Sequence, residues 1–316
     1  MASSFTNTNF WLRRKLGFTE VRQEKFRLAA HRLGEVTWAV MKHRMGGIGV
    51  AILVFSCVLA LLAPFLTSSG LLANPEAKIY PAFLDPSWQH PFGTDFNGKD
   101  ILSRVVWGSR VSLLVGLLAS VIAAVLGTLV GLASGYWGGA RDEILMRIND
   151  VFLSLPWLAL LLVVAYILGG RLSLFVIIFA IGVTGWNFTA RVVRAQVLSV
   201  KERVFVERAR AAGAGEWQIL RKHIFPNVFP LVFANTILSV AVAILSESTL
   251  AYLGKTDTNN LSWGVILQEA SSNSAVLIGK WAWIVMPGLA LVIVVLGFSL
   301  LGYALDEILN PKLRER

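Results

Sequence analysis

Few residues in this chain have the types and spacing for covalent or metal chemistry. The four histidines are scattered and share the chain with a single cysteine, Cys57, so they form no metal-ligand pattern. The stretch DFNGKD at 95–100 has its glycine in the wrong place for a calcium loop. The GKT at 254–256 lacks a phosphate-binding loop's first glycine, because Thr249 stands there. We expect no catalytic residue, no metal and no nucleotide or other cofactor bound by this chain.

One acidic residue, Glu247, stands inside a long apolar run. On insertion scales a charged side chain in the middle of a span costs about 2.5–3.5 kcal/mol, so such residues are functional candidates. Glu247 is therefore expected to line a translocation path, to pair across a subunit interface, or to serve a structural role by hydrogen bonding. The structural role is the favoured of these interpretations.

The segment 206–227, VERARAAGAGEWQILRKHIFPN, is charged and broken by glycine between two of the longest apolar runs. Its pattern predicts a short helix over 206–212, a turn at Gly213, and a second helix over 216–224 that leads to Pro226. Small residues keep the first helix thin, and Glu207 is spaced to pair with Arg203 and Arg210. We expect a helix displayed at the end of two rigid spans. The residues assigned to it are Glu207, Ala209, Arg210, Ala211, Ala212, Gly213 and Pro226.

The composition predicts that membrane-spanning helices hold the segment 206–227 in place. Of the 316 residues, 55% are hydrophobic and only 15% are charged, and several apolar runs reach the roughly 20 residues that a membrane span needs. The sequence predicts an all-α integral membrane protein with six transmembrane helices. The predicted spans are 46–66, 111–136, 151–168, 172–190, 228–253 and 281–305.

Orientation follows from the basic residues. With six spans, 22 of the 29 Lys and Arg residues fall on the side of both termini, which is expected to be the cytoplasm. This placement also argues against nucleic-acid binding. Residues 1–45 form a basic cytoplasmic segment, for which an interfacial helix and an ordinary solvated segment fit equally well. Residues 67–110 are expected outside, 111–305 form a five-helix core, and 306–316 form a cytoplasmic tail.

Glycines recur along the second predicted span. Gly127, Gly131 and Gly135 follow one another at four-residue spacing, which places them on one helix face. Glycines spaced in this way let a neighbouring helix approach closely. We therefore predict a tightly packed helix pair here.

From residue 90 onward the chain resembles the permease subunits of ATP-binding-cassette importers, in the dipeptide and oligopeptide branch. Their cytoplasmic signature is matched in register by Glu207, Ala209 and Gly213, with Arg208 in place of an alanine, and Pro226 matches its ending. Further blocks match in order and spacing. They are HPFGTDFNGKDILSRVVWGSRVSLLVG at 90–116, ESTLAYLG at 247–254, SWG at 262–264, PGLAL at 287–291 and LDEILNPKL at 305–313.

The resemblance implies a type I importer permease fold, with a coupling helix near 206–224 between the fourth and fifth spans. It also implies a homologous second permease subunit, two cassette ATPase subunits (or one fused) that bind ATP and Mg, and an extracytoplasmic solute-binding protein. The expected location is the cytoplasmic membrane of a bacterium or archaeon, and the expected cargo is di- or oligopeptides.

Two other classes of protein stay open on the residues alone. An ion-gradient-driven secondary transporter would usually show ionisable residues near mid-membrane and two matching halves, whereas only Glu247 qualifies here. A membrane scaffold that transports nothing is also compatible with a displayed helix.

Overall fold

The computed structural model describes residues 34–70, 72–77, 80–169 and 171–309. The described residues form helices and loops with two isolated β-bridges, Thr94 to Asp100 and Leu172 to Thr256. The predicted basic segment 1–45 lies mostly outside the described residues, as does most of the predicted tail 306–316. Of the segment 1–45, residues 34–42 are helical.

From Arg44 onward, twelve helical elements follow one another along the described chain. They are α2 (Arg44–Ser68), α3 (Ile101–Trp137), α4 (Gly139–Ser154), α5 (Trp157–Ile167), α6 (Leu174–Thr184), α7 (Trp186–Lys201), α8 (Val204–Ala211), α9 (Glu216–Ile219), the π-helical turn η1 (Leu220–Ile224), α10 (Phe225–Tyr252), α11 (Trp263–Ser272) and α12 (Ala282–Leu309).

Five stretches of the described chain are long and apolar enough to cross a membrane, and a sixth does so as a broken pair. The five are Arg44–Thr67, Ile101–Trp137, Leu174–Lys201, Glu216–Tyr252 and Ala282–Leu309. The broken pair is α4 with α5. All six predicted spans fall on these helices, and the predicted all-α membrane fold is confirmed.

The third predicted span, 151–168, is not one straight helix. It begins within α4 and continues into α5, and the two helices meet at an angle of 91°. Leu155 has extended backbone angles, and Pro156 precedes the first residue of α5. The residue before a proline is pushed out of the helical region, and proline cannot donate to the preceding turn. The helix therefore ends at Ser154 and restarts in a new direction.

Helix α3 extends beyond the second predicted span, 111–136. It begins at Ile101, where the Asp100 side chain accepts a hydrogen bond of 2.8 Å from the Ser103 backbone N–H. This is an ordinary N-cap. The predicted outer segment 67–110 therefore ends in about three helical turns, which hydropathy missed because they carry Arg104 and Arg110.

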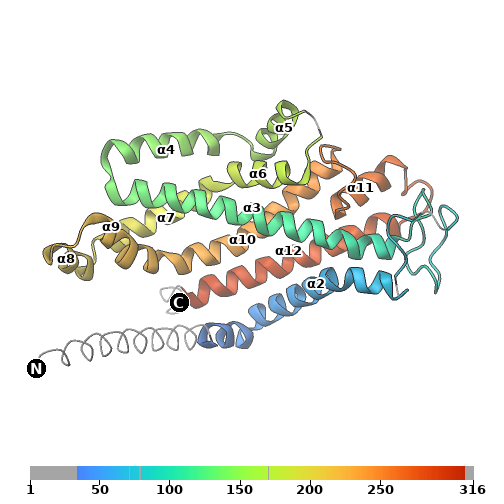
Figure 1. Ribbon diagram of the computed structural model, residues 1–316, viewed down its shortest axis with the longest axis horizontal. Helices are drawn as coiled ribbons and strands as arrows, with labels where there is room; N and C mark the ends of the chain where they lie inside the picture. The colour runs from blue at the N-terminus through green and yellow to red at the C-terminus, as the bar shows by residue number, and fades with distance from the viewer. Residues whose placement is uncertain (1–33, 71, 78–79, 170, 310–316) are drawn as a thin grey trace, which may run out of the picture.

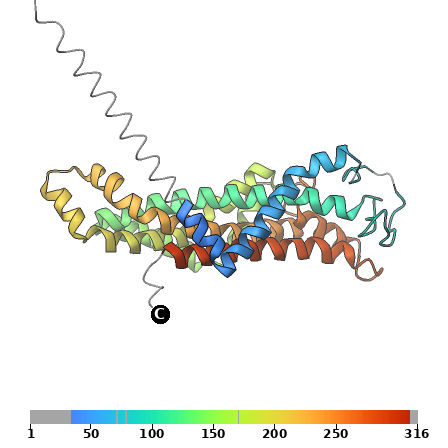
Figure 2. The ribbon, with the colours of Figure 1, turned by 90° about the horizontal axis from the view of Figure 1, so that it is seen from below.

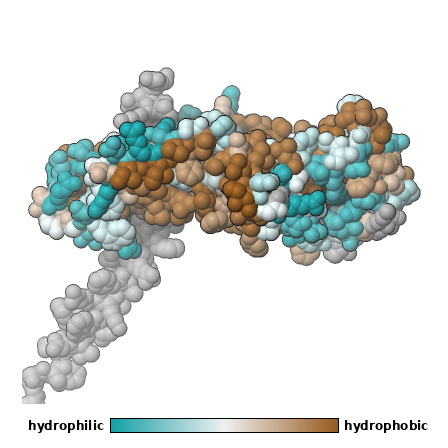
Figure 3. Space-filling model, turned by 90° about the horizontal axis from the view of Figure 1, so that it is seen from above, coloured by the Kyte–Doolittle hydropathy of each residue, from teal (hydrophilic) through white to brown (hydrophobic). Residues whose placement is uncertain are grey.

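The helices form one elongated bundle, with α3 along its centre (Figure 1). Helices α2 and α12 lie on one side of α3 and helices α4 to α6 on the other, while α7 crosses behind α3 towards α8 (Figure 1). Helices α8 and α9 lie at one end of the bundle, and α11 lies at the other with the segment 80–100. Figure 2 shows the same two ends from below. On the face drawn in Figure 3, hydrophobic residues form a belt between hydrophilic ends, as expected for a membrane-embedded chain.

Candidate functional site

The short helix α8 stands at one end of the bundle with most of its surface free. Its one fully buried residue is Val206, which belongs to an apolar cluster, while Ala209 is half-buried. The other residues assigned to this site, Glu207, Arg210, Ala211, Ala212 and Gly213, are exposed. The helix therefore has a thin, mixed-charge exposed face, and Val206 anchors it in the protein.

The end of α8 is a glycine cap. Gly213 has φ +79°, where side chains are strained, and nothing would meet a Cβ placed on it. The Gly213 N–H donates to the Arg210 carbonyl and the Ala214 N–H donates to the Ala209 carbonyl, both at 3.0 Å. These two bonds form a Schellman motif, which reverses the chain sharply. The turn predicted at Gly213 is thus present.

The ion pairs predicted along α8 are absent. Within the described residues, Glu207 makes no ion pair with Arg203 or Arg210, although the spacing allows both. All three side chains are exposed, where such a pair contributes only about 0.3–0.5 kcal/mol. The charges of α8 consequently remain available to a partner.

An apolar cluster anchors α8 and α9 to three long helices. Its buried members are Leu132 from α3, Val193, Val197 and Val200 from α7, Val206 from α8, Ile219 from α9, Ile224 from η1, and Val228 and Val232 from α10. A hydrogen bond of 3.0 Å from the Trp137 side chain to Glu216 further ties α9 to the end of α3. The cluster therefore packs α8 and α9 closely against α3, α7 and α10.

Pro226 lies in the first turn of α10, where a missing N–H costs little. The π-helical turn η1 precedes it, with the Phe225 N–H bonded to the Leu220 carbonyl. The predicted second helix over 216–224 is thus α9 and η1, which join α10. Together these elements form one continuous stretch, Glu216–Tyr252.

The three glycines of α3 all face α7. A Cβ on Gly127 would lie 2.6 Å from the Thr189 Cβ, and a Cβ on Gly131 would lie 2.6 Å from the Ala190 carbonyl oxygen. A Cβ on Gly135 would lie 2.8 Å from the Val197 Cβ. Distances below 3.0 Å are essentially never seen for a real Cβ. The two helices therefore lie backbone against backbone along about two turns, and α7 leads directly to α8.

Ion pairs hold α4 on α7 near the α8 end. The Arg194 guanidinium donates to both oxygens of Asp142, each at 2.6 Å, and the Ser134 hydroxyl also donates to Asp142. Asp150 pairs at 2.5 Å with Arg191. Two-pronged arginine–carboxylate contacts fix geometry as well as energy.

Glu247 is buried, with 2% of its surface exposed. Three serine hydroxyls surround its carboxyl group, from Ser112 on α3, Ser248 on α10 and Ser262 before α11. The Ser112 Oγ also accepts a bond of 3.3 Å from the Trp263 N–H. Glu247 thus joins three elements at the α11 end. This arrangement suits the structural role favoured from the sequence.

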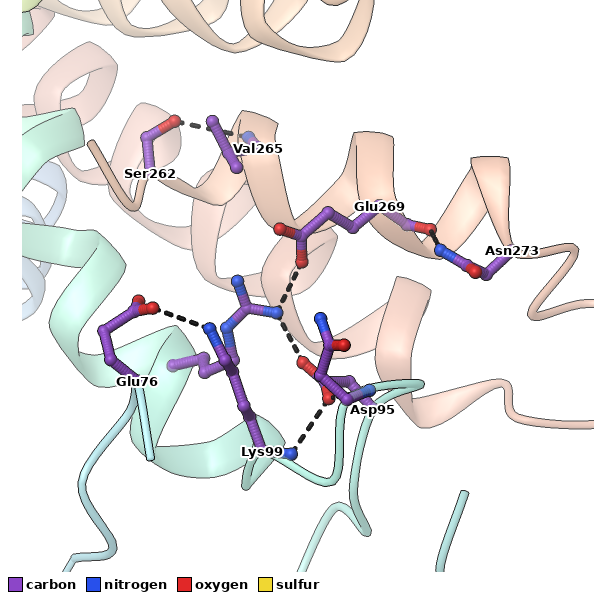
Figure 4. A network of polar contacts seen from close by, with 9 residues as sticks. Glu76, Asp95, Lys99, Ser262, Val265, Glu269 and Asn273 are labelled. Carbon is purple, nitrogen blue, oxygen red and sulfur yellow. Dashed lines mark hydrogen bonds and ion pairs between the residues drawn. The ribbon is translucent and has the colours of Figure 1, made fainter. Parts of the chain in front are cut away.

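Sequence inspection missed a buried ionic network at the α11 end (Figure 4). The Arg104 Nη1 donates to Asp95 at 2.6 Å and to Glu269 on α11 at 2.5 Å. Arg104 is 2% exposed and Asp95 is 0% exposed. The other Asp95 oxygen accepts two backbone N–H groups, one of them from Lys99 at 2.9 Å. The network ties the loop 93–100 to both α3 and α11. Arg104 on α3 and Glu269 on α11 are 165 residues apart in the sequence.

Together, the bundle and α8 define a multi-pass helical membrane protein with an exposed short helix at one end. Comparison with known proteins places it more narrowly. Residues 127–315 match the family described as the binding-protein-dependent transport system inner membrane component. The chain belongs to this family.

Several relatives are similar over most of their length. The dipeptide transport system permease protein DppC of Bacillus subtilis is 35% identical over 86% of this chain and 83% of its own. The oligopeptide transport system permease protein OppC of Haemophilus influenzae is 38% identical over 71% and 70%. The probable D,D-dipeptide transport system permease protein DdpC of Escherichia coli is 33% identical over 88% and 91%.

A solved structure shares the fold. A chain of the MetNI methionine ABC transporter, in an inward-facing conformation, superposes with a TM-score of 0.53 at 23% identity. The match covers 66% of this chain and 96% of that one. The predicted importer permease fold is therefore confirmed, and neither the secondary-transporter nor the scaffold interpretation gains support.

Proposed function

We propose that this chain is a permease subunit of an ATP-driven importer that carries di- or oligopeptides across the cytoplasmic membrane. The names of its relatives, which are dipeptide and oligopeptide permeases, suggest the peptide cargo. The chain makes and breaks no covalent bond. ATP and Mg are bound by partner ATPase subunits, and this subunit converts their movement into a change of access.

The observation that carries this proposal is the way α8 packs against the long helices while most of its surface stays exposed. The helix is exposed except for buried Val206 and half-buried Ala209, and Val206 packs into a cluster shared by α3, α7 and α10. A partner that pushes α8 therefore acts on three spans at once. The contact surface consists of Glu207, Ala209, Arg210, Ala211, Ala212 and Gly213, and Pro226 lies in the first turn of α10, which receives the movement. Closure of the ATPases then rocks the spans between inward-facing and outward-facing states.

The assembly around the chain follows from the same proposal. A second, homologous permease completes the path, and two ATPase subunits (or one fused) receive the two coupling helices. A solute-binding protein delivers cargo to the α11 end. The α8 end and both termini then lie in the cytoplasm of a bacterium or archaeon, in keeping with the basic residues of that side.

The test is reconstitution of the complete complex in proteoliposomes. Uptake of a labelled dipeptide is measured together with ATP hydrolysis, with and without the binding protein. We expect hydrolysis to rise with loaded binding protein, and uptake to require both ATP and all subunits. Uptake by this chain alone, driven by a proton or sodium gradient, would contradict the proposal.

Two glycines of the turn offer a matched pair of variants. Gly213→Val forces a β-branched residue to φ +79°, whereas Gly215→Val introduces the same side chain at φ −66°. Nothing lies within 4 Å of a Cβ at either position. We expect Gly213→Val and Glu207→Lys to hydrolyse ATP with little uptake, while membrane insertion is intact and Gly215→Val works normally. Normal coupling in the first two variants would remove α8 from the proposed role.

A further inference from the structure

A groove of about 940 Å³ opens between α2 and α3 at their α11 ends. Apolar residues of both helices line it, among them Cys57 and Leu61 from α2 and Leu114 and Leu117 from α3. Leu61 and Leu114 are exposed. The segment 259–261, before α11, closes one side of the groove and contributes the polar side chains of two asparagines.

Arg110 lies at the polar end of this groove. It is the last charged residue before 111–136, a stretch of α3 without any charge, so it marks the membrane–water boundary. Its guanidinium lies 4.8 Å from the centre of the Trp107 ring. The Trp107 Nε1 donates to the Thr67 hydroxyl of α2 at 2.8 Å, which fixes the ring and, through it, the arginine.

The charge of Arg110 is available. The guanidinium is exposed and, within the described residues, forms no ion pair. Glu76 also lines the groove, but its carboxylate pairs with Lys99 at 2.6 Å. The groove therefore combines the exposed Arg110 guanidinium at the membrane–water boundary with apolar walls. These walls extend about two helical turns along α3 into the membrane, from Arg110 to Leu117.

We propose that this groove is a phospholipid site. The phosphate binds Arg110, and one acyl chain lies along Leu114, Leu117 and α2. A phosphate offers the acceptor oxygens that a guanidinium fork prefers. The apolar walls face the hydrocarbon depth, where an acyl chain is the natural occupant. The lipid thus fills the space between α2 and α3 beside the polar network of the α11 end.

The primary test is native mass spectrometry of the purified complete complex, with phosphatidylglycerol as the probe. A charge-assisted hydrogen bond contributes about 1.5–3 kcal/mol, so Arg110→Gln should weaken binding at this site about tenfold or more. Arg110→Lys, which keeps the charge but not the fork, should lose less. Equal lipid retention by the native protein and Arg110→Gln would overturn the proposal.

The groove walls provide a matched pair of variants. Leu114 and Leu118 are 43% and 44% exposed and lie one turn apart, but Leu114 lines the groove and Leu118 does not. Leu114→Trp should displace the lipid and Leu118→Trp should leave it bound. Equal effects of the two variants would show that the lipid binds elsewhere, which would also overturn the proposal.

Cys57, the chain's one cysteine, reports occupancy directly. In the complete complex, phosphatidylglycerol should slow the labelling of Cys57 by N-ethylmaleimide severalfold, and Arg110→Gln should abolish this protection. Protection by glycerol phosphate alone would show that free phosphate suffices and would refute a lipid site. Cross-linking of Cys57 to the second permease would show that a subunit covers the groove and would refute it equally.

Discussion

Replacing Gly131 by valine should separate α3 from α7. A Cβ on Gly131 would lie 2.6 Å from the Ala190 carbonyl oxygen and 2.7 Å from the Val193 Cβ, whereas ordinary contact begins at 3.4 Å. Because one of these atoms belongs to the backbone, the helices must move apart by roughly 1 Å, which forfeits dispersion contacts along their seam.

The size of the effect follows from this geometry. Overpacking a close-packed seam costs about 1–3 kcal/mol, and the better helix propensity of valine over glycine offsets only a few tenths of a kcal/mol. A net loss of about 2 kcal/mol corresponds to a fall in Tm of about 3 °C for a chain of 316 residues. The purified complex in detergent, heated while tryptophan fluorescence is followed, measures this fall.

The control is Gly288→Val in α12, because nothing lies within 4 Å of a Cβ on that helical glycine. Its Tm should stay within about 1 °C of the native value. In proteoliposomes Gly131→Val should also transport less peptide per ATP, since α7 leads to the proposed coupling helix. If Gly131→Val and Gly288→Val have equal Tm values, the close approach of α3 and α7 is not what holds this half of the bundle together.

Three further substitutions test the polar contacts. Arg104→Gln leaves the buried Asp95 carboxylate without its cation and should destabilise the complex by about 3–5 kcal/mol, seen as a lowered Tm. Glu247→Gln keeps a side chain that can meet the serine hydroxyls and should transport cargoes of every charge normally, whereas Glu247→Leu should lower the Tm; a change in charge preference with Glu247→Gln would place this residue on the path. Asp142→Asn removes one side of a half-exposed pair with Arg194 and should cost about 1 kcal/mol, with a smaller difference from the native protein at high salt.

Much of this architecture could be predicted from the sequence, because the bilayer imposes simple rules. A span must be apolar over a fixed length, so the six runs were recognisable without knowledge of their neighbours. Local backbone features could also be predicted from the sequence. Gly213, which has a positive φ, follows the end of α8, and Pro226 lies in the first turn of α10. The glycine spacing on α3 indicated a close helix partner, although it did not indicate which helix.

Other features depend on contacts between distant segments, which leave no local pattern. The bend at Leu155 and Pro156 was missed because a proline within an apolar run is compatible with a kinked span as well as with a sharp break. The start of α3 at Ile101 was missed because Arg104 made those turns too polar, and only the fold supplies its partners Asp95 and Glu269.

The sequence alone determined which segments enter the membrane and where the chain displays a charged helix, because both depend on the chemistry of adjacent residues. The tertiary structure decided what each polar side chain does. Glu247 meets serines from two other segments, and Arg110 remains open at a groove between two helices. Such roles are set by the distance between groups far apart in the chain, and that distance exists only once the helices have packed.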